Sequence, residues 1–395
     1  MNRTVIINGK LIFPNEIWEN GYIILENGLI SDITREEPEI NSSDNVIDAK
    51  GNYVAPGFID IHTHGAGNSD FMDATVDAYL NIAETHARYG TTALLPTTLT
   101  STDEELFYTF DIYKKAKEEN KKGAQFLGMH LEGPYFAYSQ RGAQDPKYLK
   151  NPIPEDYMKI LGRTDDIVRW SIAPELDGAI ELGKVLKSKD IIASVAHTDA
   201  VFEEVVEAFE SGGYTLMTHF YSAMSSVTRR NAYRYAGAVE AGYYLDGMDV
   251  EIIADGIHLP QSLLKLIYKL KGSDRIALVT DSMRGAGMPD GHYKLGSLEK
   301  GQEVLVEDGV AKLLDRSAFA GSVATADRLV RTMVQIAEVP LVEAVKMITL
   351  VPARILKVNH KKGSLAKGMD ADIVIFDDQI NIQATIIGGK PIYKI

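Results

Sequence analysis

The chain of 395 residues is long enough for one large α/β barrel or two ordinary domains, and its 45% hydrophobic and 24% charged residues are typical of a soluble globular protein. Its formal charge of −14 gives no electrostatic attraction to nucleic acid or to an anionic membrane, so we expect neither as a partner, and an anionic small substrate would need a local basic patch. The absence of cysteine excludes disulfides and thiolate ligands and leaves His, Asp and Glu to hold any metal.

The first residues of the chain do not resemble a signal peptide, because they carry one arginine and only a short apolar stretch broken by Asn8 and Gly9. No apolar run of 18 residues occurs in the sequence, so no membrane-spanning helix is expected. These features favour a cytoplasmic protein.

Both ends of the chain have the pattern of short strands separated by turns. Apolar runs alternate with turn residues, and the pairs Asn8-Gly9 and Asn27-Gly28 are strong signals for hairpin turns. We predict a small β-sandwich domain built from residues 1–53 and 360–395, which encloses a catalytic domain of residues 54–359.

Between the two ends, apolar runs of strand length alternate with amphipathic helical stretches. The predicted strands are 57–61, 91–97, 124–130, 167–173, 190–196, 214–219, 250–254 and 275–280. The predicted helices are 73–89, 103–120, 176–188, 200–211 and 261–270, with 323–337 and 341–350 closing the outer ring. Eight strands with intervening helices predict a (β/α)8 barrel of the TIM type. A doubly wound open sheet is the alternative, but no glycine-rich nucleotide loop follows the first strand.

The first predicted barrel strand ends on the pair His62 and His64. Because side chains alternate between the two faces of a strand, both histidines point to the same side, with Cα atoms roughly 6.5 Å apart. Two neutral imidazoles that converge in this way form half of a site for a transition metal. A lone His-x-His pair is weak support, so the metal hypothesis depends on ligands from the other strands.

Further metal-ligating residue types occur where the other predicted strands end. In a barrel, the carboxyl ends of the strands meet on one rim, and catalytic groups lie there. Most of the nine histidines of the chain fall on this rim. The residues in question are His62 and His64, His130 and Glu132, His197, His219, Asp255 and His258, and Asp281. This recurrence predicts a metal-dependent active site.

Several of these motifs together resemble the amidohydrolase superfamily, and within it the branch that deacetylates amino sugar phosphates. The segments that carry the resemblance are Glu132-Gly133-Pro134, Ala196-His197, Thr218-His219, Ala254-Asp255-Gly256-Ile257-His258 and Thr280-Asp281. The resemblance covers nearly the whole chain, since residues 362–377 are similar to the superfamily's usual return into the small sheet.

The resemblance implies a set of metal ligands. Glu132, His197 and His219 match the principal metal-binding residues, and Asp281 is included in the predicted metal-binding set. His62 and His64 match a second metal position that some members replace with Gln and Asn. The implied cofactor is a divalent metal, one or two ions per subunit, with Zn²⁺ first and Fe²⁺ as the alternative. Glu132 is the candidate bridge between two ions.

Asp281 corresponds to the catalytic aspartate of the superfamily. A divalent metal lowers the pKa of water and polarises an amide carbonyl. Asp281 would take the proton of the attacking water and pass it to the departing amine. The implied reaction converts N-acetylglucosamine 6-phosphate into glucosamine 6-phosphate and acetate.

The resemblance also implies substrate contacts. His258 matches a substrate-contacting histidine, and Arg230, in a dense basic stretch, matches a phosphate-binding arginine. Two positions depart from the family pattern: Gln144 stands where histidine is usual, and Ser222 where asparagine is usual. The full set of predicted substrate-binding residues is Ala143, Gln144, Ser222, Ala223, Arg230, His258, Phe319, Ala320 and Gly321.

The two departures leave alternatives open. N-acetylgalactosamine 6-phosphate, an unphosphorylated amino sugar or another small amide could be the substrate. A non-catalytic binding protein on the same fold would usually lose metal ligands, which this chain keeps, and a ring deaminase would release ammonia in place of acetate. The resemblance also implies a homodimer.

Overall fold

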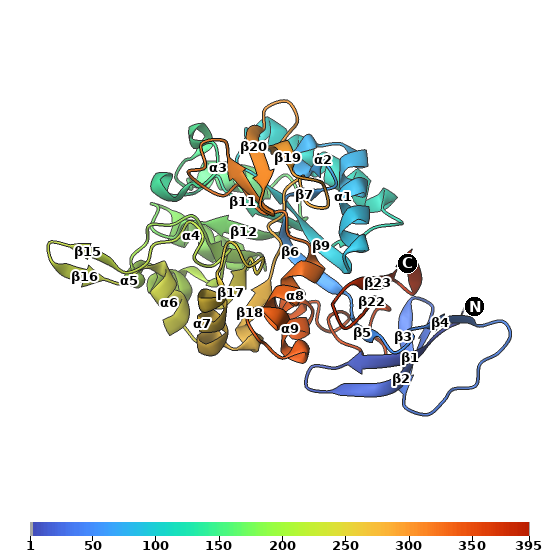
Figure 1. Cartoon of the computed structure of the whole chain (residues 1–395). Helices are drawn as coiled ribbons and strands as arrows, with labels where there is room; N and C mark the ends of the chain where they lie inside the picture. The colour runs from blue at the N-terminus through green and yellow to red at the C-terminus, as the bar shows by residue number, and fades with distance from the viewer. Residues whose placement is uncertain (1–2, 395) are drawn as a thin grey trace.

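Eight parallel strands form the barrel predicted from the sequence (Figure 1). The computed structural model describes residues 3–394, apart from the side chain of Arg230. In spatial order the strands are β6 (Phe58–Thr63), β9 (Thr91–Thr98), β11 (Met129–Glu132), β12 (Ile167–Ile172), β13 (Ile192–Val195), β14 (Tyr214–Met217), β17 (Asp249–Ile252) and β18 (Ile276–Leu278). The short β10 (Gln125–Phe126) also pairs with β9.

Helices surround the barrel as expected for a (β/α)8 fold. They are α1 (Val76–Arg88), α2 (Asp103–Glu119), α3 (Pro154–Leu161), α4 (Ala179–Ser188), α5 (Phe202–Glu207), α6 (Ala238–Tyr244), α7 (Gln261–Lys271), α8 (Ala326–Gln335), α9 (Leu341–Ile348) and α10 (Leu350–Ile355). The sequence did not predict α3, α6 and α10, which are 8, 7 and 6 residues long. No helix among the described residues is long and apolar enough to cross a membrane. The cytoplasmic location stays a prediction.

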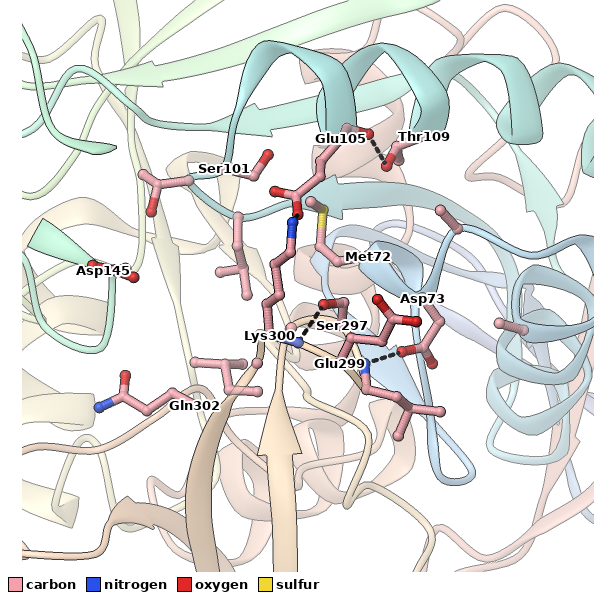
Figure 2. Close-up of a pocket in the computed structure, with 18 of the residues that line it drawn as sticks. Met72, Asp73, Ser101, Glu105, Thr109, Asp145, Ser297, Glu299, Lys300 and Gln302 are labelled. Carbon is pink, nitrogen blue, oxygen red and sulfur yellow. Dashed lines mark hydrogen bonds and ion pairs between the residues drawn. The ribbon is translucent and has the colours of Figure 1, made fainter. Parts of the chain in front are cut away.

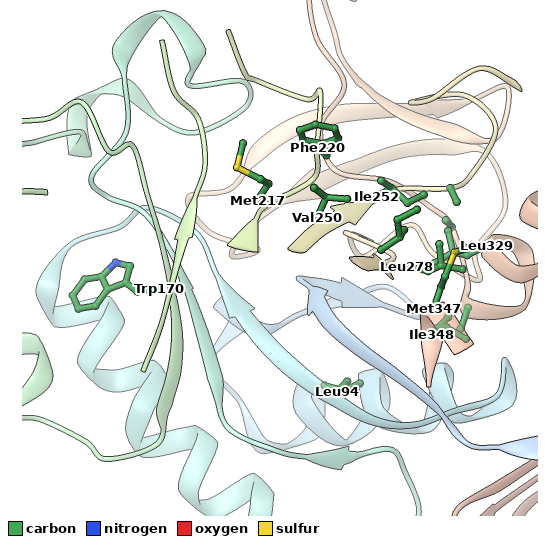
Figure 3. Packing of buried hydrophobic residues seen from close by; sticks show 14 of the residues in the cluster. Leu94, Trp170, Met217, Phe220, Val250, Ile252, Leu278, Leu329, Met347 and Ile348 are labelled. Carbon is green, nitrogen blue, oxygen red and sulfur yellow. The ribbon is translucent and has the colours of Figure 1, made fainter. Parts of the chain in front are cut away.

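A large apolar core lies between the barrel strands and the helices (Figure 3). Trp170 of β12 is fully buried in it, and its indole N–H donates a hydrogen bond of 2.8 Å to the carbonyl of Gly133. Burial of such a side chain contributes about 2 kcal/mol or more to folding. The core therefore also holds the segment that follows Glu132.

The two ends of the chain meet in one mixed sheet beside the barrel. It contains β1 (Thr4–Ile12), β2 (Ile17–Glu26), β3 (Leu29–Thr34), β4 (Asn45–Asp48), β5 (Tyr53–Pro56), β22 (Ile373–Phe376), β23 (Ile382–Ile387) and β24 (Lys390–Lys394). Pairing of β5 with β22 joins the N-terminal strands to the C-terminal ones. The division into residues 1–53 with 360–395, and 54–359, stays our proposal.

One of the two predicted hairpin turns is present. Asn27-Gly28 connects β2 to β3, and both residues have positive φ, at 55° and 81°. The turn predicted at Asn8-Gly9 is wrong, because both residues lie inside β1, where the pairing with β2 is irregular. A Cβ at residue 9 would lie 2.6 Å from a methyl group of Val54, so glycine is needed for close packing there and not for a turn.

Three small β units were not predicted. A hairpin of β15 (Thr228–Arg230) and β16 (Tyr233–Tyr235) projects away from the barrel (Figure 1). After β18, a three-stranded sheet contains β19 (Gly291–Leu295), β20 (Gln302–Glu307) and β21 (Val310–Leu313). The remaining short pair is β7 (Gly65–Ala66) with β8 (Ser69–Asp70).

Candidate metal centre

Two groups of three ligands, both buried, lie at the carboxyl ends of the strands. One group is His62, His64 and Glu132, and the other is Glu132, His197 and His219. In each group, one ligand atom per residue lies within 4.8 Å of the others, and Glu132 belongs to both. The structure thus brings together five ligands that come from four strands or the loops after them.

The carboxylate of Glu132 is the centre of this cluster. Its Oε1 lies 3.2 Å from Nε2 of His219 and 3.5 Å from Nε2 of His197. The same oxygen is 3.4 Å from Nε2 of His62, whereas Oε2 is 3.3 Å from Nε2 of His64. One carboxylate therefore faces both histidine pairs.

The residues present fit a divalent metal. Both ring nitrogens of His62 are buried without a hydrogen-bond partner, which costs free energy unless another group satisfies them. The Nε2 atoms of His197 and His219 lie 3.2 Å apart and face each other across Glu132. Imidazole nitrogens and carboxylate oxygens are the donor set of zinc and non-haem iron sites. Binding of a metal would satisfy the Nε2 atoms, whereas Nδ1 of His62 lies 3.5 Å from Oε2 of Glu251.

Backbone carbonyls orient two of the histidines. Nδ1 of His197 lies 2.7 Å from the carbonyl of Gln140, and Nδ1 of His64 lies 3.3 Å from the carbonyl of Thr97. A carbonyl accepts only from a protonated nitrogen, so each Nε2 is left as the lone-pair donor that a metal needs. The sequence carries no signal for these partners, because any residue supplies a carbonyl.

Asp281 lies against the second group. Its Oδ1 is 3.4 Å from Nε2 of His62 and 3.2 Å from Nε2 of His64. Burial alone would raise the pKa of Asp281, but the neighbouring positive charge of His62 and a hydrogen bond from His64 lower it below the usual value. The carboxylates of Asp281 and Glu132 raise the pKa of His62 to about 9 against the opposing effect of burial.

Close packing fixes the backbone at Asp281. The residue has a φ of 46°, and its carbonyl accepts a hydrogen bond of 2.7 Å from the N–H of Ser322. A Cβ at Gly321 would approach this carbonyl to 3.0 Å, and Gly321 itself has a φ of 63°, so glycine suits the position. Residues far along the chain thus hold Asp281 in place.

His130 lies outside both ligand groups, although it belongs to the same rim in sequence. Its Nε2 is 2.7 Å from the hydroxyl of Ser171, and its Nδ1 is 3.2 Å from the hydroxyl of Thr97. Its ring packs edge-on against that of His62, with centroids 4.7 Å apart. His130 is therefore a buried, hydrogen-bonded residue of the rim that belongs to neither ligand group.

A pocket of about 320 Å³ opens over the metal ligands. Of the predicted substrate-binding residues, seven line it: Ala143, Gln144, Ser222, Ala223, His258, Phe319 and Gly321. Ala320 does not, because it packs in a small apolar core and its N–H donates to the carbonyl of Ala311. Arg230 belongs to β15 in the projecting hairpin, and its side chain lies outside the described part of the structure.

His258 is held by a residue that the sequence did not assign a role. Its Nδ1 lies 2.8 Å from Oδ2 of Asp255, and Oδ1 of Asp255 accepts from the backbone N–H of His258, also at 2.8 Å. The ring packs against Phe319 with centroids 4.6 Å apart. The spacing of three residues between a carboxylate and a histidine was the available signal for this pair.

A larger cavity of about 990 Å³ lies beside this pocket (Figure 2). Leu99, Ala143, Gln144 and Leu295 line both spaces. The larger cavity lies between the start of α2 and the β19–β20 turn, and Lys300 pairs with Glu105 across it. None of the five metal ligands lines it, so the chemistry belongs to the smaller pocket.

Comparison with known proteins agrees with this site. Residues 53–392 match the model of the amidohydrolase family, and the chain belongs to that family. It is 33% identical over 384 residues to the N-acetylglucosamine-6-phosphate deacetylase of Bacillus subtilis (strain 168), across 96% of this chain and 94% of that protein. It is 30% identical to the N-acetylgalactosamine-6-phosphate deacetylase of Escherichia coli O157:H7, across 98% of this chain and 99% of that one.

A solved structure extends the similarity to three dimensions. It is a mutant N-acetyl-D-glucosamine-6-phosphate deacetylase from Mycobacterium smegmatis in complex with N-acetyl-D-glucosamine-6-phosphate. The two chains superpose with a TM-score of 0.91 at 27% identity, and the match covers 100% of both.

Proposed function

We propose that this protein hydrolyses the acetamide bond of an N-acetyl amino sugar phosphate, with N-acetylglucosamine 6-phosphate as the first candidate. The observation that carries this proposal is the pair of buried ligand groups that share Glu132 beneath a pocket, with Asp281 against them. The similarity to deacetylases over nearly the whole chain supports the choice of reaction.

Glu132, His197 and His219 would hold the principal metal, and His62 and His64 with Glu132 a second one. A divalent metal there would lower the pKa of water and polarise the acetamide carbonyl. We favour Zn²⁺, with Fe²⁺ as the alternative, because both accept nitrogen and oxygen ligands.

Asp281 is the proposed general base and acid. Its lowered pKa keeps the carboxylate ionised at neutral pH, so it can accept the proton of the attacking water. It then returns this proton to the amine nitrogen as the C–N bond breaks. His258, held by Asp255 on the wall of the pocket, is placed to hydrogen-bond a sugar hydroxyl.

An unphosphorylated amino sugar is the second candidate, and one observation favours it. None of the residues that line the 320 Å³ pocket in the described part of the chain is lysine or arginine. A phosphate needs a cationic partner, and Arg230 is our candidate for that role. A homodimer stays a proposal as well.

A panel of substrates tests the proposed function. Acetate release is measured with N-acetylglucosamine 6-phosphate, N-acetylgalactosamine 6-phosphate and the two unphosphorylated sugars. We expect the highest kcat/KM for N-acetylglucosamine 6-phosphate. A higher value for the galactosamine compound reassigns the sugar, and a higher value for the free sugars reassigns the substrate class. Acetate release from none of them contradicts the proposal.

A further inference from the structure

Gln144 connects the bridging carboxylate to the end of a barrel strand. Its Nε2 donates a hydrogen bond of 2.9 Å to Oε2 of Glu132. Its Oε1 accepts two hydrogen bonds from Thr100, one from the backbone N–H at 3.0 Å and one from the hydroxyl at 2.9 Å. Gln144 is 6% exposed and Glu132 is 3% exposed, so these hydrogen bonds are largely shielded from bulk water.

These contacts leave the side-chain amide one orientation. The end that faces Thr100 meets a backbone N–H, which only the carbonyl oxygen can accept. The other end meets a carboxylate, which only the NH2 group can approach as a donor. A flipped amide would lose the hydrogen bonds to the backbone N–H of Thr100 and to the carboxylate of Glu132. Thr100 therefore fixes the orientation in which Gln144 meets Glu132.

The locked amide sets the rotation of the Glu132 carboxylate. With Oε2 held by Gln144, this oxygen faces His64 at 3.3 Å, and Oε1 faces His219 at 3.2 Å. Oε2 is thereby directed to His64, whereas Oε1 lies within 3.5 Å of His62, His197 and His219. Without the bond from Gln144, the carboxylate could rotate and present both oxygens to the His197–His219 side.

We propose that Gln144 is a positioning residue that keeps Oε2 of Glu132 available to the second metal. The sequence comparison suggested a substrate contact for this position, but the amide oxygen and one amide hydrogen are already used within the protein. Supporting contacts of this kind usually change metal affinity by 10- to 100-fold when they are removed. The inference rests on the two-metal centre of the proposed function and not on the identity of the sugar.

The test is metal binding to the full chain, measured without substrate. Metal-free wild type and Gln144→Met are titrated with Zn²⁺, and bound metal is counted by elemental analysis. We expect the variant to keep the tighter site and to bind the second ion about 10- to 100-fold more weakly. Equal affinities for both ions in wild type and variant would overturn the proposal, as would a wild type that binds one ion.

Arg141 provides a control on the same loop. Its side chain does not line the pocket over the ligands, and its guanidinium donates a hydrogen bond of 2.9 Å to the carbonyl of Tyr138 and not to a ligand. Arg141→Met should bind both ions as wild type does, and an equal loss in this variant would show a general loop effect and overturn the proposal.

Substitutions at Thr100 test the same inference with a smaller change, through the same measurement of metal binding. Thr100→Val removes the hydroxyl that holds Oε1 of Gln144, whereas Thr100→Ser keeps it. We expect Thr100→Val to lower the affinity for the second ion and Thr100→Ser to keep it near the wild-type value. Thermal unfolding of the metal-free proteins shows that each variant is folded. Failure of the proposed reaction can be distinguished from failure of this inference. A protein that binds two ions with this pattern but releases no acetate would contradict only the proposed reaction.

Discussion

The backbone N–H of Asp281 donates a hydrogen bond of 2.8 Å to the carbonyl of His62, and this bond joins the end of the last barrel strand to the end of the first. Next to it, the N–H and hydroxyl of Thr280 both donate to the buried carboxylate of Asp60. The proposed acid–base residue and a proposed metal ligand are therefore held by one contact where the barrel closes. A shift of either strand end would move both groups.

Asp281→Asn should keep the metal and lose most of kcat. Asparagine is nearly isosteric but cannot accept and return a proton at neutral pH, and general acid–base catalysis typically contributes about 10²- to 10⁴-fold. Steady-state kinetics of acetate release, together with elemental analysis of the same preparation, check this. Turnover near that of wild type would exclude the role of Asp281.

His64→Asn should reduce the metal content from two ions per chain to one. The His62–His64–Glu132 group loses a ligand, whereas the Glu132–His197–His219 group is intact. His130→Gln is the control, because His130 is equally buried in the same rim but hydrogen-bonds only Ser171 and Thr97. Two ions in His64→Asn, or the same loss in both variants, contradicts the assignment.

Arg230→Ala tests whether Arg230 binds the phosphate group of the substrate. If Arg230 binds the phosphate group, the variant should raise KM for the phosphorylated substrate by about 10-fold or more and leave the free sugar unaffected, since a charge-assisted contact contributes about 1.5–3 kcal/mol. Arg229→Ala, one residue away in β15, is the matched control. Equal effects on KM for the phosphorylated and the free sugars would contradict the role of Arg230 in phosphate binding.

Stability should fall in acid partly because of His86. Burial lowers the pKa of His86 from 6.5 to about 4. Because the pKa in the folded state is the lower one, the unfolded state binds more protons between about pH 6.5 and 4, so the free energy of unfolding falls as pH falls through this window. A shift of this size is worth roughly 3 kcal/mol.

His86→Gln removes the titrating group while keeping a polar partner near the hydroxyl of Thr63, which lies 3.0 Å from Nε2 of His86. Urea unfolding at several pH values should therefore show a shallower decline for the variant than for wild type. Parallel curves between pH 6.5 and 4 would show that His86 does not contribute.

Much of the metal centre could be predicted from the sequence, because parallel strands bring their carboxyl ends to one rim. His62, Glu132, His197 and His219 each follow an apolar run, and strand geometry alone places them together. The pattern also included His130, since a histidine at a strand end looks the same whether it faces the metal or a serine hydroxyl.

Other features depend on contacts that no local pattern carries. The bond from Gln144 to Glu132 requires a loop to return across the rim, and Gln140 orients His197 through a backbone carbonyl. Asn8-Gly9 is a turn signal locally, but core residues on both sides, such as Ile6 and Leu11, keep β1 continuous through it. Tertiary packing decided these positions.

Acetate release from N-acetylglucosamine 6-phosphate, before and after metal removal, tests the central claim most directly. The purified chain is stripped with a chelator, assayed, and assayed again after addition of Zn²⁺ or Fe²⁺. Metal-dependent deacetylation predicts that activity disappears with the metal and returns as the ion is restored. Undiminished acetate release from protein shown to be metal-free would contradict it.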